Sequence, residues 1–91
     1  MLFVALVVQV SFAQTRTISG TVTDDSGVPL PGVNVLISGT STGTQTDFDG
    51  LYSIEASTGD VLTFSYVGFS PQDVTVGTSS TIDVQLTAGE A

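Results

Sequence analysis

The chain has 91 residues and a formal net charge of −8, and Arg16 is its only cation. This balance excludes nucleic acid as a partner and disfavours anionic membrane surfaces, because both require a basic surface. Without cysteine there is no disulfide framework or thiolate metal site, and without histidine or lysine no conventional base could activate a serine, so we expect no catalytic residue, no cofactor and no enzyme activity.

Residues 1–13 are predicted to be the remnant of a signal peptide. An apolar run is followed by small residues at Ser11 and Ala13, which would occupy positions −3 and −1 before a cleavage site. The run is too short to span a bilayer, which needs about 20 apolar residues. It has no positively charged start, so a buried strand or an N-terminal anchor is the alternative, and we expect a fragmentary gene or a start codon assigned too late. We expect one domain over residues 14–87, and residues 88–91 would begin a linker towards a missing C-terminal part.

Seven short strands are predicted in the rest of the chain. Alternating apolar and polar residues, typical of half-buried strands, occur at 17–23, 33–38, 51–55, 61–66, 73–76 and 81–86, and residues 44–46 are expected to form a short polar strand at an edge. The side chains expected to face the core are Ile18, Gly20, Val22, Val33, Val35, Ile37, Tyr52, Ile54, Leu62, Phe64, Tyr66, Ile82, Val84 and Leu86. With turn residues between them, these strands predict an all-β fold: a small seven-stranded antiparallel β-sandwich, transthyretin- or immunoglobulin-like with Greek-key connections, from about Thr15 to Leu86.

A rigid connection is predicted between the first two strands, in the segment Val28-Pro29-Leu30-Pro31-Gly32. The two prolines fix φ and remove two backbone donors, so the segment cannot form a central strand. We expect Leu30 to fill the edge of the core. The alternative is that Leu30 is an exposed docking residue.

The aspartates of the turns are candidate calcium ligands. Asp47 and Asp49 have the spacing of two ligands in an EF-hand loop, but Ala56 stands where the bidentate glutamate belongs, so an EF-hand is excluded. A looser site formed by Asp24, Asp25 and Asp47 across two loops is an alternative. The simpler interpretation is that each aspartate caps its own turn, and we expect no metal site.

The aromatic residues offer two interpretations. Phe64, Tyr66 and Phe69 could form a platform that stacks on sugars, but Phe64 and Tyr66 fall on the inward face of their strand and are expected to pack in the core. Phe69 follows a glycine and could be exposed, and Phe48 lies at a turn tip between two aspartates. Phe48 and Phe69 are therefore the candidate contact residues for a partner.

The order of the motifs carries a family resemblance. The motifs are Gly20-x-Val22-x-Asp24-x-x-Gly27-x-Pro29-Leu30-Pro31-Gly32-Val33-x-Val35, then Gly39-Thr40, Gly43-Thr44, Thr46-Asp47-x-Asp49-Gly50-x-Tyr52 and Leu62-x-Phe64-Ser65-Tyr66-Val67-Gly68-Phe69. Over residues 17–87 this order resembles the carboxypeptidase-regulatory-like, transthyretin-like domain that opens SusC/RagA-type TonB-linked outer-membrane transporters.

The resemblance implies a non-catalytic accessory domain, exported to the periplasmic face of the outer membrane. In that family a plug and barrel follow in the same polypeptide and import glycans or peptides, and a SusD-like lipoprotein is a partner only through the full-length transporter. The chain would then be a fragment of such a transporter, and its acidic surface suggests a periplasmic partner with a basic patch. The alternatives are a stand-alone secreted module that binds carbohydrate or protein, and a structural spacer.

Overall fold

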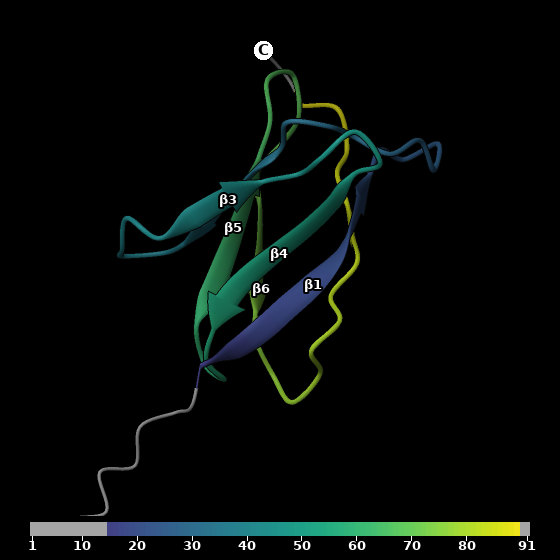
Figure 1. Cartoon of the computed structure of the whole chain (residues 1–91). Helices are drawn as coiled ribbons and strands as arrows, with labels where there is room; N and C mark the ends of the chain where they lie inside the picture. The colour runs from purple at the N-terminus through teal and green to yellow at the C-terminus, as the bar shows by residue number, and fades with distance from the viewer. Residues whose placement is uncertain (1–14, 90–91) are drawn as a thin grey trace, which may run out of the picture.

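A computed structural model describes residues 15–89, which fold into two β-sheets that enclose one core (Figure 1). The strands are β1 (Arg16–Thr23), β2 (Asn34–Ile37), β3 (Gly43–Gln45), β4 (Leu51–Ala56), β5 (Val61–Ser65), β6 (Gln72–Thr75) and β7 (Val84–Gln85). One sheet has the strand order β4-β1-β7, and the other has the order β3-β2-β5-β6. The predicted all-β sandwich of seven strands is confirmed.

The core follows from the alternation along the strands. Its buried apolar side chains are Ile18, Val22, Leu30, Val33, Val35, Ile37, Tyr52, Ile54, Ala56, Leu62, Phe64, Val76, Val84 and Leu86. Of the side chains expected to face inward, Tyr66 and Ile82 are only half-buried, although both pack against this cluster. Tyr52 from one sheet meets Phe64 from the other edge to face, with ring centroids 5.3 Å apart. An edge-to-face pair of this kind adds to the free energy gained by burying the rings.

The last strand differs from the prediction in direction and in length. β7 pairs with β1 in parallel, so this sheet is mixed, whereas the other described strand pairs are antiparallel. β7 has only two residues, although the alternation predicted a strand over 81–86. Thr81 makes an isolated parallel bridge with Ser19, in the same register as the pair of Val22 and Val84.

The gap in this parallel ladder has a structural cause. The N–H of Thr21 donates to a carboxylate oxygen of Asp83 at 2.9 Å, in place of a backbone carbonyl. The carbonyl oxygen of Ile82 accepts a hydrogen bond from the Tyr52 hydroxyl at 2.7 Å. Two side chains therefore satisfy backbone groups that a regular strand would pair with each other.

The Pro29–Pro31 connection is held at the edge of the core, as predicted, and passes into a turn at Pro31 and Gly32. Leu30 is 8% exposed, and its N–H donates to the carbonyl oxygen of Val22 at 2.9 Å. The buried hydroxyl of Thr46 donates to the carbonyl oxygen of Leu30 at 2.5 Å and accepts from the N–H of Val33 at 2.9 Å. This connection is therefore hydrogen-bonded to both sheets.

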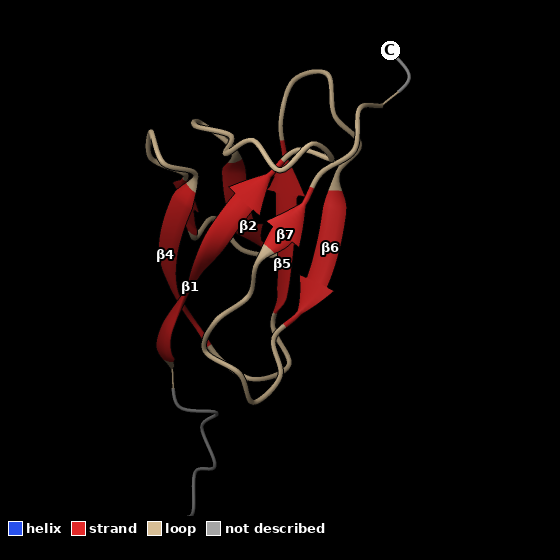
Figure 2. Cartoon of the chain, turned by 90° about the vertical axis from the view of Figure 1, so that its right-hand side faces the viewer, coloured by secondary structure: helices blue, strands red, loops and turns tan. Residues whose placement is uncertain are grey.

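The two long sides of the sandwich differ. On one side β6 lies beside β7 (Figure 2), where the Gln72 side chain donates to the carbonyl oxygen of Gln85 at 3.2 Å and the N–H of Ser70 donates to that of Thr87 at 2.9 Å. On the other side β3 and β4 follow each other in the chain but lie in different sheets and do not pair. The sandwich is hydrogen-bonded across its first side, and its second side carries the edges of β3 and β4.

At the C-terminal end, backbone pairing continues beyond Thr87. Ala88 forms an isolated bridge with Phe69, and the N–H of Gly89 donates to the carbonyl oxygen of Gly68 at 3.0 Å. The proposed signal segment, residues 1–13, lies outside the described residues. Within the described part of the chain, no helix is long and apolar enough to cross a membrane.

Candidate functional site

Three loops at one end of the sandwich carry exposed apolar side chains. Phe48 is 93% exposed in the turn between β3 and β4, and Val67 is 92% exposed in the turn after β5. Val28 is also exposed, in the loop after β1. Figure 1 shows all three loops at one end of the molecule, opposite the start of β1. We call this end, with Val28, Phe48 and Val67, the loop end.

A hollow of about 400 Å³ lies beside Phe48 at the loop end. Pro31, Gly32, Thr46, Asp47 and Phe48 line it. A Cβ atom added to Gly32 would lie 3.7 Å from a ring carbon of Tyr66, so the hollow adjoins the turn that carries Val67. Large exposed apolar side chains around a hollow are typical of a surface that contacts another molecule.

The two candidate contact residues have different surroundings. Phe48 projects into solvent, whereas Phe69 is half-buried and packs near Tyr66, with ring centroids 5.8 Å apart. Phe64 is fully buried, so these rings do not form an open platform for sugars. Of the two candidates, Phe48 offers by far the larger free surface.

Asp24 and Asp47 cap their own turns. One carboxylate oxygen of Asp24 accepts from the N–H groups of Ser26 and Val28, at 2.8 and 2.9 Å. Asp47 does the same for the N–H groups of Asp49 and Leu51, each at 2.9 Å. Within residues 15–89 no three acidic side chains come together as a metal ion would require, so Asp24, Asp25 and Asp47 do not converge.

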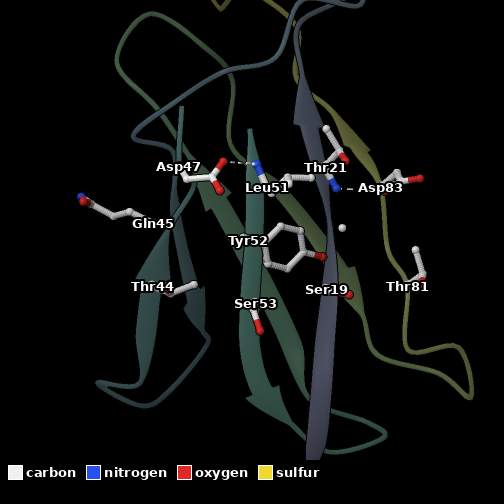
Figure 3. A pocket seen from close by; sticks show the side chains of 11 residues that line it. Ser19, Thr21, Thr44, Gln45, Asp47, Leu51, Tyr52, Ser53, Thr81 and Asp83 are labelled. Carbon is white, nitrogen blue, oxygen red and sulfur yellow. Dashed lines mark hydrogen bonds between the residues drawn. The ribbon is translucent and has the colours of Figure 1, made fainter. Parts of the chain in front are cut away.

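A second hollow, of about 570 Å³, lies over β4 and β1. Figure 3 shows β3 on one side of it and the segment 81–83 on the other. Its lining side chains are mostly hydroxyl-bearing, with two carboxylates: Ser19, Thr21, Thr44, Gln45, Asp47, Leu51, Tyr52, Ser53, Thr81 and Asp83. Sequence reasoning missed this site, although the outward-facing polar residues of the two strands were readable from the alternation.

Tyr52 lies beneath this second hollow. Burial of the side chain, and then the charge of Asp83, raise the pKa of Tyr52 to about 12. Its hydroxyl therefore keeps its proton at neutral pH and donates to the carbonyl oxygen of Ile82. A Cβ atom added to Gly20 would lie only 1.8 Å from that same oxygen, so the close approach of the chain segments requires glycine.

Arg16 is engaged at the opposite end from the loop end. Its guanidinium donates to the hydroxyls of Ser80 and Thr58, at 3.0 and 2.9 Å, and to the carbonyl oxygens of Gly77 and Ser79. The only cation of the chain thus joins two turns to the start of β1. The surface charge that remains to meet a partner is acidic.

Comparison with known proteins gives a consistent result. The family model described as a CarboxypepD_reg-like domain matches residues 18–91. The chain is 54% identical over 78 residues to TonB-dependent receptor P26 of Formosa agariphila, covering 86% of this chain and 8% of that receptor. It is 46% identical over 66 residues to TonB-dependent receptor SusC of Bacteroides thetaiotaomicron, covering 72% of this chain and 7% of that receptor. The chain therefore spans less than a tenth of the receptors it matches.

Solved structures show a similar fold at low sequence identity. A chain of a type II cohesin-X-dockerin complex from Acetivibrio cellulolyticus superposes with a TM-score of 0.66 and 20% identity, covering 80% of this chain and 58% of that chain. This likeness supports the β-sandwich architecture alone.

Proposed function

The chain belongs to the CarboxypepD_reg-like domain family, and from this membership we propose that it is the N-terminal accessory domain of a TonB-dependent outer-membrane transporter. One observation carries the proposal: 54% identity to a TonB-dependent receptor over 86% of the chain. The matched region covers nearly the whole sandwich. Other TonB-dependent receptors match the chain at 44% or 46% identity.

The location and partners follow from this role. The domain is exported and lies at the periplasmic face of the outer membrane, and a plug and barrel in the same polypeptide carry out the import of glycans or peptides. A SusD-like lipoprotein meets it only through the full-length transporter. The proposal puts the domain at residues 14–87, with a signal segment before it and a linker after it, and Ala88 and Gly89 still pair with the turn after β5.

A non-catalytic role is supported by the chemistry of the described residues. The turn aspartates Asp24 and Asp47 are held by backbone N–H groups, and Tyr52 keeps its proton up to high pH. Acid–base catalysis needs a group whose pKa lies near the working pH and which can reach a substrate. These residues bind backbone instead.

The loop end is the proposed contact surface, with Phe48 as its main residue and Phe69 as a supporting one. An exposed aromatic side chain beside an apolar hollow can bury a large area against a partner. The acidic surface favours a periplasmic partner with a basic patch, and contact through exposed charges should weaken with salt because the Debye length is about 10 Å at 0.1 M. Partner binding that does not change with salt concentration would contradict a partner with a basic patch.

The proposal is tested by reading the genomic sequence that follows the codon of Ala91. We expect the frame to continue into a TonB box, a plug and the strands of a barrel. A stop codon at this point, or a hydrolase domain in the same frame, would instead favour a stand-alone binding module or a spacer.

A further inference from the structure

The two sheets end in four edge strands, and these edges are unequally protected. β3 has three residues and β7 has two, and β6 has four and begins directly after Pro71. β4 has six residues and contains no proline or lysine. Short strands, prolines and lysines are what proteins use to prevent unwanted pairing at an edge. The edge of β4 is the longest of the four, and Glu55 is the only charged side chain on it.

Three residues of β4 direct their backbone groups away from β1. Since the N–H of Val22 donates to the carbonyl oxygen of Gly50, the alternating pattern of an antiparallel pair directs the backbone groups of Leu51, Ser53 and Glu55 outward. Asp47 takes both groups of Leu51: its N–H donates to the Leu51 carbonyl oxygen, and its carboxylate accepts from the Leu51 N–H.

Ser53 and Glu55 have no such neighbour. Within residues 15–89 no strand pairs with β4 on this side, because β3 belongs to the other sheet. The opposite side of the sandwich is joined by the contact of Gln72 with Gln85. The second hollow, described above, runs beside this open edge and includes Ser53 in its lining (Figure 3).

The charges beside the edge are negative. Asp47 and Asp83 line the hollow, and Glu55 lies on the outward face of β4, where the Thr17 hydroxyl donates to one of its carboxylate oxygens. In the described residues the only cation, Arg16, is held by hydroxyls and carbonyls at the end away from the loop end. A second copy of this chain would bring a further net charge of −8, and its one arginine would be held in the same way.

We propose that the edge of β4 binds an extended segment of a second protein, carrying lysine or arginine at alternating positions, as an added strand. The backbone of the segment bonds to the N–H and carbonyl groups of Ser53 and Glu55. Its basic side chains face Glu55 and the carboxylates of the second hollow. Affinity in this mode comes mostly from main-chain hydrogen bonds, and the alternating side chains supply selectivity. The proposal concerns the isolated domain and does not depend on which polypeptide follows it.

The test is a titration of the ¹⁵N-labelled chain with two capped heptapeptides that alternate threonine with either lysine or glutamate. We expect the lysine peptide to shift the amide signals of Ser53 and Glu55 and to slow their hydrogen exchange. The glutamate peptide should bind at least about tenfold more weakly, a difference of about 1.4 kcal/mol. No shift with the lysine peptide up to about 1 mM, or shifts confined to β6 or the loop end, would overturn the proposal.

Two variants separate main-chain pairing from general attraction. Ser53→Pro removes an N–H that points away from β1, and proline is tolerated at an edge strand, so the fold should survive while peptide binding is lost. Ser53→Thr keeps the N–H and should bind like the parent chain. Equal binding by the proline variant and the parent would overturn the proposal.

Glu55→Lys provides a second test that leaves the backbone unchanged. We expect it to weaken the binding of the lysine peptide severalfold and to strengthen the binding of the glutamate peptide. An unchanged preference for the lysine peptide over the glutamate peptide would contradict the proposed basic occupant. A stable dimer of the parent chain in sedimentation, if Ser53→Pro abolished it, would contradict it as well. In the dimer case the occupant of the edge would be a second copy.

Discussion

Among the glycines described by the structure, Gly20 has the least space for a side chain. The carbonyl oxygen of Ile82 would lie 1.8 Å from an added Cβ atom, and because this atom belongs to the backbone it cannot move aside cheaply. Gly20→Ala should therefore destabilise the fold by about 1–3 kcal/mol or more, the cost of overpacking a tight site. Urea unfolding monitored by circular dichroism measures this change.

Gly77→Ala is the matched control for this substitution. Gly77 has no heavy atom within 4 Å of an added Cβ atom and no positive φ, so alanine there should be neutral or stabilising by up to about 1 kcal/mol. If the Gly20→Ala and Gly77→Ala variants unfold at the same urea concentration, Ile82 does not lie as close to β1 as the structure shows.

Tyr52 makes the stability of the fold sensitive to alkaline pH. An unfolded tyrosine has a pKa of about 10, and in the fold burial followed by the charge of Asp83 raises the pKa of Tyr52 to about 12. Between these values the unfolded chain has lost the proton that the folded chain keeps. The stabilisation that comes from the raised pKa of Tyr52 is therefore fully present below about pH 10 and is lost as the pH rises from about 10 to about 12.

Tyr52→Phe removes the group that titrates. We expect a loss of about 1 kcal/mol at neutral pH, from the missing hydrogen bond to Ile82, and a shallower fall in stability above pH 10 than in the parent chain. Urea unfolding at a series of pH values compares the two slopes. Identical slopes would mean that another group controls alkaline unfolding.

At the scale of the residue, the sequence predicts which side of a strand a side chain faces better than it predicts which residues are in contact. The alternation placed Gly20 and Tyr52 on the inward face. It did not reveal that both are arranged around the carbonyl oxygen of Ile82, because that oxygen belongs to a segment 30 residues from Tyr52 and farther still from Gly20 in the chain. The second hollow was missed for the same reason, since its lining comes from separate segments.

At the scale of the element, the Pro29–Pro31 connection carries a clear prediction. Leu30 is 8% exposed and Phe48 is 93% exposed. Leu30→Ala should destabilise the fold by about 2–5 kcal/mol, because it leaves a cavity at the edge of the core. Phe48→Ala should change stability by less than about 0.5 kcal/mol, as is usual for surface positions.

Chemical denaturation of the two variants provides the measurement. A large loss of stability in Phe48→Ala together with full stability in Leu30→Ala would reverse the assigned roles. Leu30 would then be the docking residue, and Phe48 would be part of the core.

Most of the strands could be predicted because they alternate over several residues and are bounded by turn residues. Asp47 and Gly50, for example, close the turn before β4 as expected, and Gly50 has a φ of +76°. The direction of β7 could not be predicted, because alternation states which side faces the core but not which strand is the neighbour. Its shortness depends on the side chains of Asp83 and Tyr52, which replace ladder hydrogen bonds.

At the scale of the whole molecule, the sandwich has two surfaces with different characters. The loop end exposes Phe48 and Val67 beside the last described residues of the chain, whereas the open edge of β4 lies along the side and is acidic. A domain with this arrangement can contact one neighbour at its end and another along its side. The two contacts can be tested separately, because Phe48 and Ser53 are on different surfaces.

The central claim is that this chain is a periplasmic domain of a TonB-dependent transporter. An antibody raised against residues 15–89, used with protease on cells that express the gene, tests the claim most directly. The account predicts an outer-membrane antigen far longer than 91 residues, protected in intact cells and digested once the outer membrane is permeabilised. A short antigen released into the medium, or an epitope digested on intact cells under conditions that spare a periplasmic control protein, would contradict it.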